Sequence, residues 1–145
     1  MSKTYISASL RRIVFERADG NCEYCLIPDA LALASHQVDH VISEKHGGET
    51  VSENLALSCS FCNQAKGSDV GSIDSETGEY VRFYHARRDG WMEHFEIDTA
   101  TGEILGMSAI GRVTVRLLQM NRAAYLPERL VLLQAGGLAL PGLVD

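Results

Sequence analysis

The chain has 145 residues, of which 46% are hydrophobic and 22% charged. This length fits one compact domain, or a small domain with an extension packed on it, and the composition excludes disordered and collagen-like classes. No apolar run approaches the roughly 18 residues of a membrane span, and the N-terminus lacks the apolar core of a signal peptide. We therefore expect a cytoplasmic protein without membrane contact. The net charge of −6 argues against tight non-specific DNA binding but is compatible with a local basic patch.

The first half of the chain predicts helices and strands in alternation. Ser7 or Ser9 can cap a helix that ends near Gly20. Residues 37–42 have the pattern of a short strand, residues 43–52 that of a loop, and residues 55–58 that of a second strand. A helix is expected over residues 60–66, with its end at Gly67.

The second half predicts two matching hairpins followed by helices. Residues 74–78 and 98–102 are similar turn segments, each followed by a strand-like run, over residues 79–84 and 103–107. Between these hairpins, residues 89–94 are expected to form a short helical turn. Ser108 can cap a helix, and Pro127 with Gly136 and Gly137 brackets a last one.

Four cysteines form two C-x-x-C pairs, Cys22 with Cys25 and Cys59 with Cys62. One such pair can be a redox motif, but two pairs with no further cysteine are typical of a tetrahedral zinc site. Four thiolates leave no open coordination position, so the predicted zinc is structural. A redox role is the alternative interpretation.

Polar residues gather between and just after the two cysteine pairs. Asp39 and His40 are neighbours on a predicted strand, so their side chains project to opposite faces. One can hold a metal ion while the other activates water. The helix after the second strand brings Asn63 and Lys66 back toward Asp39. The pattern predicts an oxygen-rich site for a divalent cation beside a candidate base.

In this arrangement the sequence resembles the HNH endonucleases of the zinc-stapled type, whose fold is the ββα-metal (His-Me finger) motif. The resemblance covers roughly residues 10 to 70. It rests on six elements in order: C-x-x-C from residue 22, V-D-H-V from 38, G-G at 47, E-N-L-A-L from 53, C-x-x-C-N from 59 and K-G at 66. Residues 82–95 and 111–115 are similar to an extension carried by one group of small bacterial HNH proteins.

The resemblance implies a role for each residue of the motif. Asp39 and Asn63 would bind a catalytic Mg²⁺ or Mn²⁺, and His40 would be the general base. Asn54 would hold the loop and orient His40, and Lys66 would contact a phosphate. Asn63 replaces the histidine that often ends the motif, and an amide oxygen favours hard ions. The implied activity is hydrolysis of DNA to 5′-phosphate and 3′-hydroxyl ends, without a small-molecule cofactor.

The sequence leaves the role of several basic residues open. Arg82, Arg87 and Arg88 form the densest basic cluster, which suits either the DNA backbone or a charged face paired with nearby acids. The roles of the other histidines stay open; these are His36, His46, His85 and His94.

We therefore expect a single α+β domain over residues 1–145. Residues 8–70 form a ββα-metal core with a structural four-cysteine zinc site, and residues 71–145 form an α/β extension packed on it. The function expected is that of a metal-dependent endonuclease. The alternatives are a zinc-stapled module that binds nucleic acid without cutting, and a degenerate nuclease that serves as an interaction domain.

Overall fold

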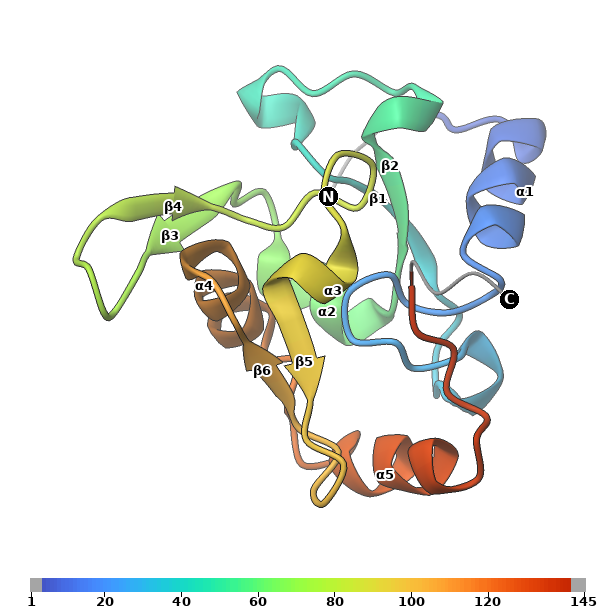
Figure 1. Ribbon diagram of the computed structural model, residues 1–145. Coiled ribbons are helices and arrows are strands. Elements are labelled where there is room, and N and C mark those ends of the chain that lie inside the picture. Colours follow the sequence, from blue (N-terminus) through green and yellow to red (C-terminus); the bar gives the residue numbers. More distant parts are fainter. Residues whose placement is uncertain (1–3, 142–145) are drawn as a thin grey trace.

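The computed structural model describes residues 4–141 and is a mixed helix and strand fold (Figure 1). Its first half contains α1 (Ala8–Arg17), β1 (Gln37–His40), β2 (Leu55–Ser58) and α2 (Ser60–Lys66). β1 and β2 pair antiparallel, with Asp39 opposite Ala56 and His40 opposite Leu55. α1 covers β2 by burying Val14 with Leu55 and Leu57. Two strands followed by one helix therefore make the predicted ββα core.

The ends of the first helices agree with the capping residues in the sequence. The Ser7 hydroxyl accepts a hydrogen bond from the Leu10 amide at 3.2 Å, which caps α1. The Cys59 sulfur accepts one from the Cys62 amide at 3.3 Å at the start of α2. α2 has the predicted bounds and ends before Gly67.

β1 is shorter than the predicted strand over residues 37–42. After His40 the backbone turns to Asn54, because Val41 N–H donates to the Asn54 carbonyl at 2.9 Å. The Ile42 N–H donates to the Asn54 side-chain oxygen, also at 2.9 Å. The Asn54 side chain thus takes the place of a backbone partner on β2, and the β1–β2 pairing ends at His40.

Residues 71–141 contain two hairpins and three helices. β3 (Gly71–Ile73) pairs with β4 (Tyr80–Arg82), and β5 (Phe95–Ile97) pairs with β6 (Ile104–Gly106). The helices are α3 (Trp91–His94), α4 (Ala109–Leu118) and α5 (Leu126–Gln134). Both predicted hairpins are present, although β4 and β6 are shorter than the predicted runs. Within residues 4–141 no helix combines the length and apolar character needed to cross a membrane.

Asp74, in the turn of the first hairpin, ties that hairpin to α4. Its buried carboxylate accepts two hydrogen bonds from the Arg112 guanidinium, both at 2.9 Å. This fork holds the pKa of Asp74 well below its usual range. On the following loop, the Tyr84 amide donates to the Thr114 hydroxyl at 2.9 Å. Arg112 and Thr114 thereby orient α4 along the β3–β4 hairpin.

The main hydrophobic core contains residues from both halves of the chain. All four cysteines belong to it together with Trp91, Phe95 and Ile104 from the second half. The Trp91 indole N–H donates to the Tyr24 carbonyl at 3.1 Å, and an Arg129 N–H donates to the Cys25 carbonyl at 3.1 Å. Residues 71–141 thus supply both apolar cover and hydrogen-bond donors to the loop between Cys22 and Cys25.

These contacts lead to a prediction about truncation. A fragment of residues 1–67 would expose the apolar face of the cysteine cluster and lose the donors to Tyr24 and Cys25. We expect it to aggregate or to melt without a cooperative transition, as measured by calorimetry beside the full chain. A fragment that melted cooperatively at the temperature of the full chain would make residues 71–145 a separate domain.

Candidate metal and hydrolytic sites

The four cysteines converge on one point in the first half of the chain, against which residues of the second half pack. Their Sγ atoms all lie within 4.8 Å of one another, and every cysteine is fully buried. The first pair lies in a tight loop, where the Cys25 N–H donates to Cys22 Sγ at 3.4 Å. The second pair lies at the start of α2. Within residues 4–141 this is the one cluster of three or more such ligands.

The spacing of the sulfurs fits a tetrahedral metal ion. Zinc–sulfur bonds of about 2.3 Å give a tetrahedron with edges of about 3.8 Å. Cys25 Sγ and Cys59 Sγ are 3.7 Å apart, which matches an edge and is far longer than a disulfide bond. The donor set and its spacing therefore fit zinc.

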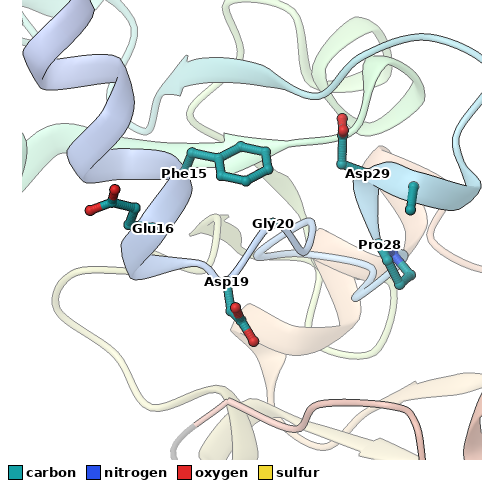
Figure 2. Close-up of a pocket in the computed structure, with 7 residues that line it drawn as sticks. Phe15, Glu16, Asp19, Gly20, Pro28 and Asp29 are labelled. Carbon is teal, nitrogen blue, oxygen red and sulfur yellow. The ribbon is translucent and has the colours of Figure 1, made fainter.

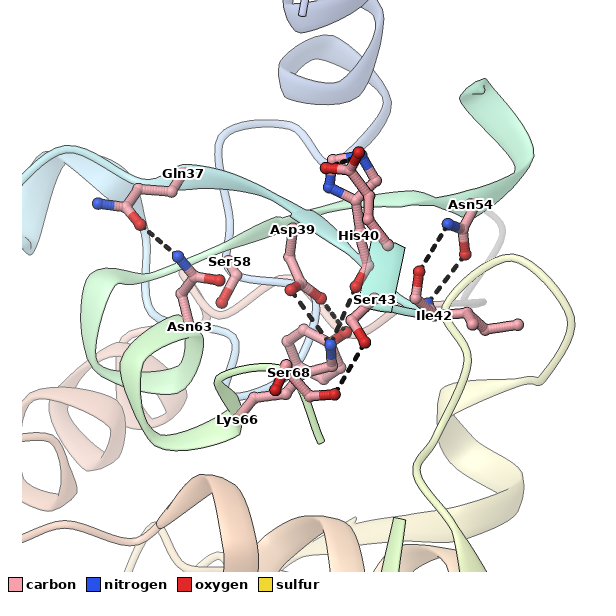
Figure 3. A network of polar contacts seen from close by, with 12 residues as sticks. Gln37, Asp39, His40, Ile42, Ser43, Asn54, Ser58, Asn63, Lys66 and Ser68 are labelled. Atoms are coloured by element: carbon pink, nitrogen blue, oxygen red, sulfur yellow. Dashed lines mark hydrogen bonds and ion pairs between the residues drawn. The ribbon is translucent and has the colours of Figure 1, made fainter. Parts of the chain in front are cut away.

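Asp39 lies at the centre of a buried polar network (Figure 3). Its carboxylate accepts a hydrogen bond from the Tyr24 hydroxyl at 2.8 Å and pairs with Lys66 Nζ at 3.2 Å. Burial raises the pKa of Asp39 above its ordinary value, and the charge of Lys66 opposes this shift. The carboxylate that was predicted to bind a metal ion is thus held by an internal cation.

The position of Lys66 corrects the prediction that it contacts a phosphate. Its side chain is fully buried, and Nζ also donates to the His40 carbonyl at 3.0 Å. α2 packs against β1, and its last turn places Lys66 over Asp39. An ammonium that is buried and paired in this way is not presented to a DNA backbone.

Asn63 lies on the same side of α2 as Lys66 but contacts a different residue. Its amide bonds to the Gln37 side chain, two residues before Asp39 on β1. Gln37 and Asp39 project to one face of the strand, and Asn63 and Lys66 are three residues apart on the helix. The two predicted metal ligands therefore face the same space without contacting each other (Figure 3).

His40 projects to the opposite face of β1 and is 6% exposed. Its Nε2 lies 2.9 Å from the Thr50 hydroxyl and 3.7 Å from a Glu44 carboxylate oxygen. No hydrogen bond to Nδ1 occurs within residues 4–141. One ring nitrogen is thus held by the loop.

Asn54 closes that loop with its side-chain amide. Nδ2 donates to the Ile42 carbonyl at 3.0 Å and to the Glu49 carbonyl at 2.9 Å, while Oδ1 accepts from the Ile42 amide. The clamp joins both ends of the segment that carries Glu44 and borders Thr50. The Asn54 side chain thus holds this loop in place beside His40.

The basic cluster is largely paired with acids. Arg82 makes two bonds to Asp89 at 2.8 and 2.9 Å, which holds the pKa of Asp89 at about 2. Arg87 pairs with Glu23, whose other oxygen accepts from the Leu57 amide at 2.8 Å. Arg88 is exposed. Arg87 thus joins the extension to the first cysteine loop, whereas Arg82 and Arg88 reach solvent.

The remaining histidines divide between packed and exposed positions. His36 Nε2 lies 2.7 Å from the Ile27 carbonyl, and His94 Nδ1 lies 2.7 Å from the Ser108 hydroxyl. His85 is buried, and its Nδ1 accepts from the Arg87 amide at 3.2 Å. His46 is exposed in the loop.

A pocket lies away from these residues, between the end of α1 and the loop after Ile27 (Figure 2). Three carboxylates line it, those of Glu16, Asp19 and Asp29. Their negative charge disfavours a phosphate-bearing ligand. The pocket includes none of the predicted site residues, and we assign it no function.

The structure also adds residues that the sequence did not single out. Tyr24 binds Asp39, and Thr50 binds His40. Tyr24 lies inside the first C-x-x-C and Thr50 follows the Gly-Gly pair, but neither position has a pattern that indicates its partner. Arg129 could have been noticed as the one basic residue of a largely apolar helix.

The structure is a ββα core in which four cysteines cluster beside α2 and an Asp-His pair lies on the first strand, β1. Residues 22–69 match the model of the HNH endonuclease family. The match includes the four cysteines, β1, β2 and α2 and confirms the resemblance seen in the sequence. Comparisons with curated proteins and with solved structures gave no significant match.

The Asn54 clamp predicts an unequal effect of two neighbouring glycines. A Cβ on Gly48 would lie 1.6 Å from the Ile42 carbonyl oxygen, whereas a Cβ on Gly47 would meet nothing within 4 Å. Gly47 has a φ of +89°, so Gly47→Ala costs only backbone strain of about 1–2 kcal/mol. We expect Gly48→Ala to lower the free energy of unfolding by more, measured by urea titration. Equal losses would contradict the close approach of the loop.

Proposed function

We propose that this protein is a metal-dependent endonuclease that hydrolyses DNA phosphodiester bonds with His40 as the general base. One observation carries the proposal: within the segment that matches the HNH family, β1 directs Asp39 and His40 to opposite faces, and Asn54 clamps the loop that holds His40. A binding module has no need to keep a base and the residue that orients it.

The surroundings of His40 support Nδ1 as the ring nitrogen that accepts a proton from water. Glu44, 3.7 Å from Nε2, favours a proton on that nitrogen, and the Thr50 hydroxyl can accept it. We assign this tautomer, which leaves the Nδ1 lone pair for water. The carboxylate also stabilises the imidazolium that forms when His40 takes the proton.

In the proposed reaction, His40 removes a proton from water as the oxygen attacks phosphorus. A bond forms between this oxygen and phosphorus, and the bond to the 3′ oxygen breaks in line with it. The leaving 3′ oxygen takes up a proton from solvent. The products are a 5′-phosphate and a 3′-hydroxyl.

Asp39 and Asn63 are the residues that would hold a divalent ion. A carboxylate and an amide oxygen suit Mg²⁺ or Mn²⁺, and both residues face one space between β1 and α2. In the present arrangement Lys66 Nζ bonds a carboxylate oxygen of Asp39, and this contact would have to open. Gln37 accepts a hydrogen bond from the Asn63 amide nitrogen, which is not the atom that would bind the ion. Such an ion supplies charge stabilisation at the phosphate.

DNA is the proposed substrate, although the chain is acidic. Arg88 is exposed and the Arg82 side chain is 51% exposed while paired with Asp89, so both can reach a phosphate. Arg87 and Lys66 are not included in the proposed contact surface, because each is bound within the protein.

The central experiment replaces the base. His40→Ala should lower the rate of plasmid cleavage in Mn²⁺ by about 10²- to 10⁴-fold, which is the usual contribution of general-base catalysis. DNA affinity and the melting temperature should change little. His46→Ala, an exposed histidine in the same loop, is the matched control and should cleave at the parent rate. A His40→Ala protein as active as the parent would refute this mechanism, and a parent without activity would favour the non-catalytic module.

We also propose that the cysteine cluster binds one zinc ion that the fold requires. Structural zinc can contribute on the order of 10 kcal/mol to folding. Elemental analysis should give about one zinc per chain, and a strong chelator should unfold the protein. Cys59→Ser should be poorly soluble. A reductant without chelator should leave the fold intact, which separates zinc from a redox disulfide; a folded metal-free protein would contradict the proposal.

The Lys66–Asp39 pair predicts a competition between lysine and metal. Lys66→Met leaves a buried carboxylate without its cation, which should cost about 3 kcal/mol of unfolding free energy in EDTA. Mn²⁺ should raise the melting temperature of this variant more than that of the parent, because the ion takes the place of the ammonium. Adding Asp39→Asn should abolish the extra shift. Equal shifts in parent and Lys66→Met would place the divalent ion elsewhere.

A further inference from the structure

Arg129 is a buried cation in the second half of the chain that no predicted role includes. It lies on α5, is fully buried and is one of the largest fully buried side chains of residues 4–141. Burying a charge is costly unless hydrogen bonds and an opposite charge compensate it. The guanidinium of Arg129 is hydrogen-bonded throughout and lies beside the cysteine cluster.

Hydrogen bonds satisfy the whole guanidinium. Nε donates to the Gly102 carbonyl at 2.7 Å, and Nη1 donates to the carbonyls of Cys25 and Met120 at 3.1 and 3.0 Å. Nη2 donates to the Met120 carbonyl at 2.8 Å and to the Asn121 side-chain oxygen at 3.2 Å. All five N–H groups of an arginine are thereby used. Every acceptor is neutral, however, so these bonds leave the charge uncompensated.

The group of opposite charge next to Arg129 would be the cysteine cluster in its zinc-bound form. No carboxylate lies within ion-pair distance of Arg129 in the described part of the chain. The cysteine cluster adjoins the guanidinium, because Nη1 donates to the Cys25 carbonyl at 3.1 Å. Four thiolates around one Zn²⁺ would carry a net charge of −2. That charge is itself buried, because all four cysteines are at 0% exposure.

We propose that Arg129 is a positioning residue of the zinc site, which fixes the first cysteine loop through the Cys25 carbonyl and offsets the negative charge of the zinc–thiolate cluster. This inference rests on the proposed zinc site. It makes zinc retention depend on a helix more than a hundred residues along the chain from Cys25. Mutation of a residue that hydrogen-bonds to a metal-ligand residue without binding the metal itself typically lowers metal affinity by about 10- to 100-fold.

The test measures zinc release from the full-length protein to a chromogenic chelator. Arg129→Met should release zinc at least about tenfold faster than the parent, and Arg129→Lys, which keeps the charge, should lie much closer to the parent. Asn121→Asp places a carboxylate against the guanidinium and neutralises it without removing Arg129. The Asn121→Asp variant should also release zinc faster than the parent. It tests the proposal if Arg129→Met does not fold.

Two controls separate the electrostatic role from loss of stability. Leu118→Ala removes buried apolar volume without changing charge, so at a matched melting temperature it should release zinc more slowly than Arg129→Met. Arg122→Met removes a cation that stacks on Phe61, 4.6 Å from the ring centre, and should behave like the parent. Release that followed the melting temperature alone, or equal release from Arg129→Lys and Arg129→Met, would overturn the proposal. A parent that held no zinc would overturn the zinc site as well.

Discussion

The convergence of four buried sulfurs is the constraint on which the rest of the structure depends. The sulfurs of Cys22 and Cys25 belong to a loop after α1, and those of Cys59 and Cys62 to the start of α2. Joining them fixes α2 relative to the first loop. Because α2 begins at the cluster and ends at Lys66, its direction also decides which side chains face Asp39 on β1. The position of the cysteine cluster thus sets the geometry around Asp39, where the proposed hydrolytic site lies.

The second half of the chain completes both sites without contributing a proposed ligand or base. Trp91 and Arg129 bond to carbonyls within the first cysteine loop, and Arg87 pairs with Glu23 in that loop. Glu23 in turn holds β2 through the Leu57 amide. The extension is therefore connected to the cluster by apolar packing and by three long side chains.

The sequence predicted the features that local signals determine. Ser7 and Cys59 cap their helices, and the two similar turn segments form matching hairpins. The spacing of the cysteines was sufficient to predict their cluster. The match of residues 22–69 to the HNH model confirms the family interpretation of this segment.

The sequence could not predict which side chains far apart in the chain would form ion pairs or hydrogen bonds with each other. A lysine at a helix end is usually exposed, yet Lys66 is buried because α2 directs it to Asp39. The arginine cluster was equally compatible with DNA contact and with ion pairs, and only the fold shows that Asp89 and Glu23 take two of its members. β1 ends early because Asn54 replaces a strand partner, which no periodicity in the sequence indicates.

We propose that one zinc ion on four sulfurs joins the first cysteine loop to the start of α2 and forms the centre on which the second half of the chain packs. X-ray absorption at the zinc edge of the purified protein measures this coordination directly. We expect four sulfur scatterers at about 2.3 Å from the zinc and no nitrogen or oxygen bound to it. A shell containing nitrogen or oxygen, or a folded protein without zinc, would contradict it.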